Sequence, residues 1–265
     1  MIPKVIHFCW LSNDPFPLSI QKCIDSWKKN MPDYEIKRWS TENFDINSVP
    51  LVKEAFETKK YAFAADYIRC YALYTEGGIY LDSDVFVQKD FSPLLIGARY
   101  VTGMEYLPLA ENLYKQQVDE NGDRRVGIDE VSGIGLQAAI MASEVEHPLM
   151  KKCLDFYRNR SLCYIMEHHL LAPVVQAQAA EEYGYKYVKK KQLLKEGVVI
   201  YPTSVFGQGC NETKGRYAIH MCAGSWVRKT LKNRLISFFA RIGIYGRYVW
   251  LKDKLSLVKP QIRNL

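Results

Sequence analysis

The chain has 265 residues, of which 48% are hydrophobic and 13% aromatic, and it carries a formal net charge of +7. This composition excludes an intrinsically disordered protein, and the length suits one large α/β domain or two small domains. Seven scattered cysteines without a C-x-x-C pair argue against a disulfide framework or a structural zinc site, and they predict a reducing compartment.

The predicted elements alternate between strand and helix in the first part of the chain. Apolar positions at helical spacing predict a helix that starts near Ser19. A longer apolar helix starts near residue 51 or 59 and ends at Thr75, because Gly77 and Gly78 stop it. We expect strands at residues 2–10, 34–39 and 79–87, and loops or a mobile insertion at residues 104–135. This order predicts a Rossmann-like, mostly parallel sheet flanked by helices.

Two carboxylates, Asp82 and Asp84, follow a short apolar run in the sequence GGIYLDSD. If the strand continues, side chains two positions apart share one face, at the carboxyl end of a strand where ligands gather in open α/β sheets. A hard divalent cation would relieve the repulsion between them. The alternative is a solvated turn at the end of the strand, since Asp and Ser are common turn residues.

Asp66 and Arg69 interrupt the long apolar helix at positions i and i+3, so they lie on one face. A structural ion pair accounts for them. A ligand site is the other account, because the arginine could balance phosphate charge and the acid could accept hydrogen bonds from hydroxyls.

Three blocks carry a family resemblance: IPKVIHFCW at residues 2–10, AADYIRCYALYTEGGIYLDSD at residues 64–84, and HMCAGSW at residues 220–226. In order and spacing they resemble the D-x-D glycosyltransferases of family 32, which are related to capsular and glycolipid sugar transferases and, more distantly, to the large glucosylating toxins. The resemblance covers residues 1 to about 226 and implies a GT-A fold. It implies transfer of a hexose, with retention, from a nucleotide sugar (UDP-sugar favoured) to a hydroxyl of a glycan or lipid-linked acceptor in polysaccharide biosynthesis.

The resemblance also assigns roles to individual residues. A Mn²⁺ or Mg²⁺ cofactor is expected, and an imidazole ligand would favour Mn²⁺. The expected catalytic residues are Asp82, Asp84 and Arg69. Asp84 would bind the metal directly. Asp82 would contact the metal through water or would instead contact the sugar and ribose hydroxyls. His220 would reach either the metal or the diphosphate. The expected donor-binding residues are Asp66 and Arg69 at the sugar, Trp10 and Tyr80 at the base and ribose, and Ser225 and Trp226 in a segment that closes over the donor.

Other interpretations stay open for several of these positions. His220 and Trp10 occupy apolar-rich stretches, where a core position is also consistent with the sequence. Relatives often carry T-G-P where this chain has Leu171-Ala172-Pro173, and the preceding His168 and His169 lie either on a solvated helix or at the acceptor. No residue stands out as a covalent nucleophile, so a front-face mechanism is our hypothesis.

Two rival functions are consistent with parts of the sequence. A haloacid-dehalogenase-like phosphatase also uses a D-x-D motif, but it prefers Thr or Val where this chain has Phe86, and it places the motif near the N-terminus. A non-enzymatic module that binds membrane surfaces would explain the C-terminal tail and leave the acidic residues without a role.

The tail concentrates the positive charge. Residues 227–265 contain ten Lys or Arg and one acid, a local net charge of +9, which leaves −2 for residues 1–226. We therefore predict a glycosyltransferase domain at 1–226 and a basic amphipathic helical tail at 227–265. Basic residues interleaved with aromatic and aliphatic ones favour an anionic membrane surface over nucleic acid, and a helical cap on the domain is the alternative.

The expected location follows from the same features. Pro3 interrupts the short apolar N-terminus, which argues against a signal peptide. No stretch of the sequence reaches the roughly 18 apolar residues of a membrane-spanning helix. We expect a cytoplasmic protein, peripheral at the inner face of the membrane.

Overall fold

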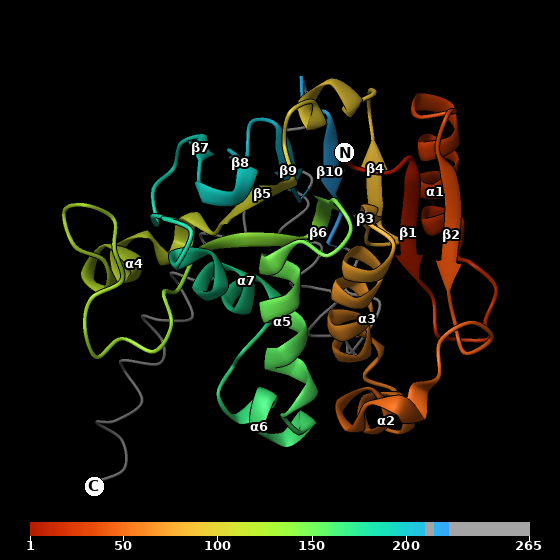
Figure 1. Ribbon diagram of the computed structural model, residues 1–265, viewed down its shortest axis with the longest axis horizontal. Helices are drawn as coiled ribbons and strands as arrows, with labels where there is room; N and C mark the ends of the chain where they lie inside the picture. Colours follow the sequence, from red (N-terminus) through yellow and green to blue (C-terminus); the bar gives the residue numbers. More distant parts are fainter. Residues whose placement is uncertain (210–214, 223–265) are drawn as a thin grey trace, which may run out of the picture. The chain divides into compact units, whose positions relative to one another are not determined.

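The computed structural model describes residues 1–209 and 215–222, which contain ten strands and seven α-helices (Figure 1). The strands are β1 (Val5–Cys9), β2 (Glu35–Trp39), β3 (Gly78–Leu81), β4 (Val85–Val87), β5 (Tyr100–Tyr106), β6 (Ile134–Ser143), β7 (Gln192–Leu193), β8 (Val198–Tyr201), β9 (Phe206–Gln208) and β10 (Ala218–His220). The helices are α1 (Leu18–Asn30), α2 (Pro50–Glu57), α3 (Tyr61–Thr75), α4 (Glu111–Gln117), α5 (Pro148–Arg158), α6 (Leu162–Glu167) and α7 (Ala172–Glu181).

Seven strands form the central sheet, in the order β2-β1-β3-β6-β5-β8-β7. Successive pairings give β2, β1, β3, β5 and β8 one direction, and β6 and β7 the opposite direction. The predicted α/β class, with a mostly parallel sheet flanked by helices, is therefore confirmed. A second, small sheet has the order β4-β10-β9.

Each face of the central sheet has its own apolar core. One face packs against α2, α3, α5 and α7, and the other packs against α1 and the small sheet (Figure 1). Strand alternation sorts the side chains: Tyr80 in β3 points to the first core, whereas Ile79 and Leu81 point to the second. The two layers bury the sheet on both sides, which explains why the central strands are apolar almost throughout.

Most element boundaries agree with the sequence expectation, and the differences have local causes. The long apolar helix is two helices, α2 and α3, because Lys59 takes a left-handed backbone conformation with φ 57° between them. Gly77 ends the second helix as predicted, with φ 66°, and a Cβ there would lie 2.8 Å from the Pro3 ring. Ser19 does not cap the first helix, which begins at Leu18 without a side-chain cap.

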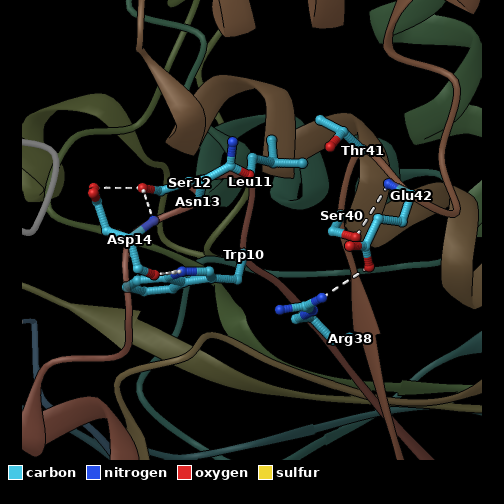
Figure 2. A pocket seen from close by; sticks show the side chains of 9 residues that line it. All are labelled: Trp10, Leu11, Ser12, Asn13, Asp14, Arg38, Ser40, Thr41 and Glu42. Atoms are coloured by element: carbon cyan, nitrogen blue, oxygen red, sulfur yellow. Dashed lines mark hydrogen bonds and ion pairs between the residues drawn. The ribbon is translucent and has the colours of Figure 1, made fainter.

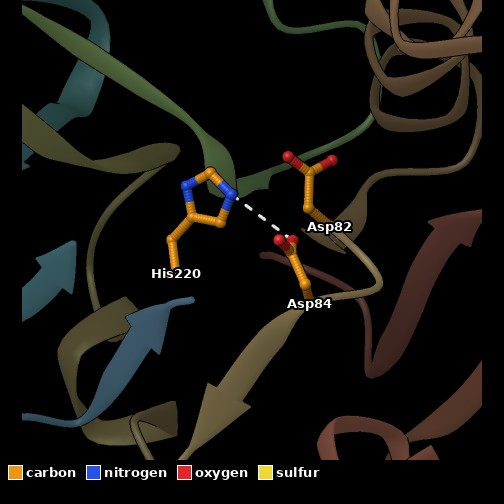
Figure 3. A group of neighbouring side chains, drawn as sticks. All are labelled: Asp82, Asp84 and His220. Carbon is orange, nitrogen blue, oxygen red and sulfur yellow. Dashed lines mark ion pairs between the residues drawn. The ribbon is translucent and has the colours of Figure 1, made fainter. Parts of the chain in front are cut away.

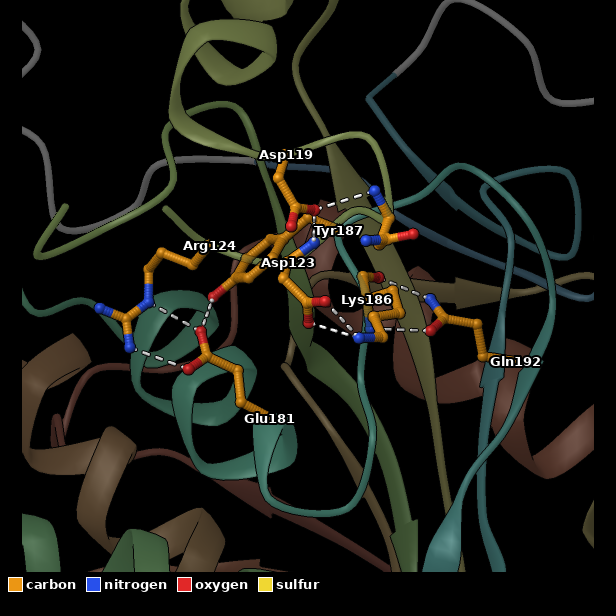
Figure 4. Close-up of polar contacts among 8 residues, drawn as sticks. Asp119, Asp123, Arg124, Glu181, Lys186, Tyr187 and Gln192 are labelled. Carbon is orange, nitrogen blue, oxygen red and sulfur yellow. Dashed lines mark hydrogen bonds and ion pairs between the residues drawn. The ribbon is translucent and has the colours of Figure 1, made fainter. Parts of the chain in front are cut away.

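The region expected to be irregular contains β5, α4 and the start of β6, joined by a loop at residues 118–133. Polar contacts hold this loop against α7 and the segment before β7 (Figure 4). Arg124 forms two hydrogen bonds of 2.8 Å with Glu181, which also accepts one of 2.7 Å from the Tyr187 hydroxyl. Lys186 pairs with Asp123. The middle of the loop is therefore anchored both to α7 and to the segment before β7.

Within residues 1–209 and 215–222, no helix combines the length and the apolar character needed to cross a membrane. The predicted tail at 227–265 and the predicted domain boundary at 226 lie outside the residues that the structure describes. Both stay predictions.

Candidate functional site

Asp82 and Asp84 lie in a tight turn between β3 and β4. β3 ends at Leu81, and the Asp82 N–H donates to the Ala139 carbonyl in β6 at 2.9 Å. The Val85 N–H donates back to the Asp82 carbonyl at 2.9 Å and closes the turn. The sequence argument explained the proximity of the two acids by a continuing strand, and that explanation is wrong. The turn brings them together at the carboxyl edge of the sheet.

His220 reaches the same place from a distant part of the sequence. β10 pairs antiparallel with β4, which sets His220 opposite Val85, and the Met221 N–H donates to the Asp84 carbonyl at 3.0 Å. His220 Nε2 then lies 3.3 Å from Asp84 Oδ1. One ligand atom from each of Asp82, Asp84 and His220 lies within 4.8 Å of the other two (Figure 3). The three predicted metal ligands are thus brought together.

The chemistry of this group fits a hard divalent cation. Carboxylate oxygens suit Mg²⁺ and Mn²⁺, and an imidazole nitrogen moves the preference toward Mn²⁺. Burial by itself lowers the pKa of His220, but its hydrogen bonds to Asp84 and Cys222 hold that pKa well above the usual value. An imidazolium or a bound cation therefore provides the positive partner of Asp84.

Arg69 connects the helix α3 to this turn. Its Nη2 lies 3.1 Å from Asp66 Oδ1 and 3.3 Å from Asp82 Oδ1. Its Nη1 donates to the Ala138 carbonyl at 2.6 Å, and its guanidinium lies 5.0 Å from the centre of the Tyr80 ring. The exposed fraction of the Arg69 side chain is only 6%. The ion pair expected within the helix is present, and the contact with Asp82 makes it part of the site.

The buried environment changes the protonation of this pair. Burial raises the pKa of Asp66 to about 7, although Arg69 opposes the rise. The carboxylate of Asp82 helps to hold the pKa of Arg69 well above its usual value, against the opposing effect of burial. A permanently charged guanidinium beside a carboxyl group that titrates near neutral pH suits a ligand with phosphate and hydroxyl groups.

A bulge in β6 holds these side chains in place, and sequence reasoning missed it. The pairing of β5 with β6 changes register just after Thr102, whose hydroxyl oxygen lies 2.7 and 2.9 Å from two carbonyl oxygens of β6. Between these two carbonyls lie those of Ala138 and Ala139, which accept hydrogen bonds from Arg69 and Asp82. Bulges recur beside active sites because they redirect backbone groups. Hydrophobic alternation in this apolar strand carries no signal for the bulge.

Glu105, Gln208 and Gln137 form a second polar group that the sequence did not reveal. Gln208 Nε2 donates to Glu105 Oε1 at 2.9 Å, and Gln137 Nε2 donates to the Gly207 carbonyl at 3.2 Å. Burial raises the pKa of Glu105, although Gln208 and His220 oppose the rise. A lone acid at the end of an apolar strand was the available signal, since Glu105 follows the run YVTGM.

Trp10 lines a pocket at the same carboxyl edge of the sheet. Its indole N–H donates to the Asp14 carbonyl at 3.0 Å, and its ring centre lies 5.0 Å from that of Phe16. The pocket has a volume of about 180 Å³ (Figure 2). The residues that line it come from the loop after β1 and from the end of β2 with its following loop: Trp10, Leu11, Ser12, Asn13, Asp14, Arg38, Ser40, Thr41 and Glu42.

The remaining predicted residues have different outcomes. Tyr80 is 1% exposed and lies under Arg69, and its expected contact with the nucleotide stays a prediction. Ser225 and Trp226 lie outside the described residues. His168 follows α6, where its Nδ1 lies 2.9 Å from the Tyr164 carbonyl, and both it and His169 are exposed. The solvated alternative for these two histidines fits their position.

Comparisons with known proteins identify the same region. Residues 17–101 match the family model described as the glycosyltransferase sugar-binding region containing the DXD motif. Inositol phosphoceramide mannosyltransferase 3 of Schizosaccharomyces pombe is 37% identical over 102 residues, which are 36% of this chain and 27% of that protein. Inositol phosphoceramide mannosyltransferase 1 of the same yeast is 22% identical over 233 residues, 85% of this chain and 62% of that protein.

A further relative and a solved structure complete the comparison. Mannosyl phosphorylinositol ceramide synthase CSH1 of Saccharomyces cerevisiae is 34% identical over 102 residues, 36% of this chain and 26% of that protein. The chain therefore spans less than two thirds of each of these curated relatives. The PaToxG glycosyltransferase structure is 21% identical, with a TM-score of 0.49 over 68% of this chain and 69% of that one. Asp82 and Asp84 lie inside the matched region, so residues 17–101 are similar to the glycosyltransferase sugar-binding region that contains the DXD motif.

Proposed function

We propose that this protein is a metal-dependent, retaining glycosyltransferase that moves a hexose from a nucleotide sugar to a hydroxyl group. The observation that carries the proposal is that each acid of the motif forms an ion pair with a different residue, and both ion pairs lie at the same turn. Asp82 pairs with the buried Arg69, and Asp84 pairs with His220. These contacts join the DXD turn to α3 and to β10.

Asp84, Asp82 and His220 would hold Mn²⁺ or Mg²⁺, which as a Lewis acid stabilises negative charge on a leaving diphosphate. The guanidinium of Arg69 holds the donor sugar with Asp66, and it fixes the orientation of Asp82 through their contact at 3.3 Å. The pocket beside Trp10 is the proposed place of the base, because nucleotides bind at the carboxyl edge of such sheets.

The reaction we propose proceeds on one face of the sugar. The bond between the anomeric carbon and the phosphate oxygen breaks, and a bond from the acceptor oxygen to the same carbon forms on the same side. The acceptor proton passes to the leaving phosphate oxygen. A glycosyl-enzyme intermediate trapped on a carboxylate of the domain would contradict this front-face route.

The names of the relatives suggest which donor sugars and acceptors to test first. Because these are named inositol phosphoceramide mannosyltransferases, mannosyl donors and a glycolipid acceptor are the first to test. The resemblance favoured UDP-sugars, so the screen should cover both UDP- and GDP-sugars. A role in polysaccharide or glycolipid synthesis follows from the same proposal. The match of residues 17–101 to the DXD family model argues against the phosphatase alternative.

Metal-dependent hydrolysis of a nucleotide sugar tests the proposal. We expect hydrolysis that requires Mn²⁺ or Mg²⁺ and falls by at least about 100-fold in Asp84→Asn, since this change removes a ligand carboxylate. Asp155→Asn is the matched control, because Asp155 pairs with Lys151 on the exposed side of α5. Hydrolysis that persists without a divalent cation, or in Asp84→Asn, would refute the proposal.

The proposed membrane contact needs its own experiment. Ten basic residues in the tail would each contribute about 1 kcal/mol near an anionic surface. We expect the full chain to float with vesicles that contain phosphatidylserine and to float less with neutral vesicles. Exchange of Arg228, Lys229 and Lys232 for Gln should weaken flotation. If this variant and the wild type float equally with the phosphatidylserine vesicles, the proposed peripheral location at the inner membrane is rejected.

A further inference from the structure

A second polar group lies beside the metal-ligand group, on the side of the small sheet. Glu105 is the penultimate residue of β5, and Gln208 of β9 donates to its carboxylate at 2.9 Å. Parallel pairing of β9 with β10 sets Gln208 directly beside His220. Both His220 and Asp82 influence the pKa of Glu105, so the three side chains share one electrostatic environment. The group formed by Glu105, Gln208 and Gln137 is called the Glu105 cluster below.

The Glu105 cluster contains buried acceptors that lack a donor. Within residues 1–209 and 215–222, neither Gln137 Oε1 nor Gln208 Oε1 has a hydrogen-bond partner, and both atoms are buried. Gly103 leaves room for the first of them, since a Cβ at this position would lie 2.8 Å from Gln137 Oε1. Buried polar atoms are nearly always paired in folded proteins. These oxygens, together with the carboxylate, need hydrogen-bond donors.

The chemistry of the cluster selects the kind of donor. A phosphate or another anion brings acceptors and negative charge, and the carboxylate of Glu105 repels it. A hydroxyl brings a proton to donate, and a neutral polyol brings several close together. The other side of the metal-ligand group contains the guanidinium of Arg69, which suits the charged donor molecule. The Glu105 side is therefore suited to a neutral, hydroxyl-rich partner.

We propose that Glu105 and Gln208 form the subsite that binds the acceptor, by accepting and orienting hydroxyl groups of a neutral sugar or cyclitol ring. The inference rests on the proposed function, because an acceptor exists only if the protein is a transferase. Glu105 binds a hydroxyl that neighbours the reacting one, and it takes no proton in the reaction. Gln208 holds the Glu105 carboxylate in position through its amide.

The experiment separates acceptor use from donor use. Full-length wild type, Glu105→Gln and Gln208→Leu are supplied with Mn²⁺ and the donor found by the hydrolysis screen. Four probes serve as acceptors: methyl α-mannopyranoside, methyl α-glucopyranoside, methyl β-galactopyranoside and myo-inositol. Transfer product and free sugar are both quantified. Glu144→Gln is the matched control, because Glu144 pairs with Arg99 at the other end of β5 and β6.

We expect at least one probe to give a transfer product with the wild type. In Glu105→Gln, KM for that probe should rise about tenfold or more, since a hydrogen bond to a charged acceptor is lost. Hydrolysis without a probe and KM for the donor should stay within about twofold of the wild type. Gln208→Leu should show a smaller rise in the same direction, and Glu144→Gln should show none.

Three results would overturn the assignment. An unchanged KM for the probe in Glu105→Gln would mean that the cluster holds only structural water. Equal loss of hydrolysis and transfer would place Glu105 in the donor or metal site. A wild type that hydrolyses the donor but uses none of the four probes would exclude a neutral polyol subsite. Absence of any metal-dependent hydrolysis is a separate outcome, which removes the proposed function and this inference with it.

Discussion

The two sides of the candidate metal centre are built in different ways. On the side of α3, Asp66 and Arg69 are close in sequence, and a buried guanidinium bridges two carboxylates. On the side of the small sheet, Glu105, Gln208 and His220 come from three separate strands and are joined by amide and imidazole groups. The first side carries a fixed positive charge and the second carries an excess of acceptors. This difference matches a site for two ligands of different charge.

The largest expected effect comes from removal of the bridge in Arg69→Met. Two carboxylates would lose their shared cation in a buried place, so the free energy of unfolding should fall by about 3–5 kcal/mol. Donor hydrolysis should fall at least about 100-fold. Urea denaturation and the hydrolysis assay measure both. The control is Arg99→Met, an exposed residue whose ion pairs should contribute about 1 kcal/mol or less. Equal stability of the two variants would contradict the bridging role.

The opposite side is tested by His220→Ala. Loss of the imidazole should weaken the apparent affinity for Mn²⁺ about tenfold or more and reduce the preference for Mn²⁺ over Mg²⁺. Titration of hydrolysis with each metal measures the change. His168→Ala should behave as the wild type, because His168 lies at the surface beside α6. Identical Mn²⁺ titrations for His220→Ala and the wild type would remove His220 from the metal site.

The bulge that lies between the two sides is tested by Thr102→Val. The valine has a similar shape but cannot bond the two carbonyl oxygens that lie 2.7 and 2.9 Å from the threonine hydroxyl. We expect a loss of about 1–3 kcal/mol in the free energy of unfolding, because buried carbonyls lose a donor. Thr102→Ser keeps the hydroxyl and should recover most of that loss. If the Thr102→Val and Thr102→Ser variants have equal free energies of unfolding in urea, the Thr102 hydroxyl does not stabilise the bulge.

The smallest expected effect concerns His7, which supports the α3 side from β1. Its Nε2 lies 2.9 Å from the Gly77 carbonyl, and the Trp39 indole donates to its Nδ1 at 3.1 Å. Burial lowers the pKa of His7 below the ordinary 6.5, and it also lowers that of His147. As the pH falls below about 6.5, the unfolded chain binds protons before the folded one, so stability is full above this pH and decreases below it.

The pH effect is measured as the free energy of unfolding in urea over a series of pH values from neutral to acidic. His7→Gln should reduce the loss on acidification and leave the part that His147 contributes. A His7→Gln profile that parallels the wild type would show that His7 is not held neutral in the fold.

Local sequence patterns predicted the α3 side well. Asp66 and Arg69 lie one helical turn apart, and the glycines after the helix place the DXD motif next to it, so nearby positions determine the geometry. The order of strands and helices also predicted the class of the fold. His220 was found only through the family resemblance, because no local pattern shows that β10 pairs with β4.

The rest depends on contacts that local patterns do not encode. Asp82 and Asp84 lie close together in a turn that is held to β6 by the Ala139 carbonyl, which lies far along the chain. The bulge lies where β6 pairs with β5, and the Glu105 cluster joins side chains from β5, β6 and β9, each of which by itself looks like an ordinary apolar run. Acceptors that lack donors become visible only when all neighbours of Gln137 and Gln208 are known.

The position of β10 has a consequence for how the protein is made. This strand lies between β4 and β9 and supplies the imidazole, although it is the last strand in the part of the chain that the structure describes. During synthesis, the DXD turn leaves the ribosome long before residue 220 does. A nascent chain therefore carries both carboxylates before the imidazole, and the proposed metal centre can be completed only after residue 220 has been synthesised. Premature termination before β10 would yield a protein that has the motif but an incomplete site.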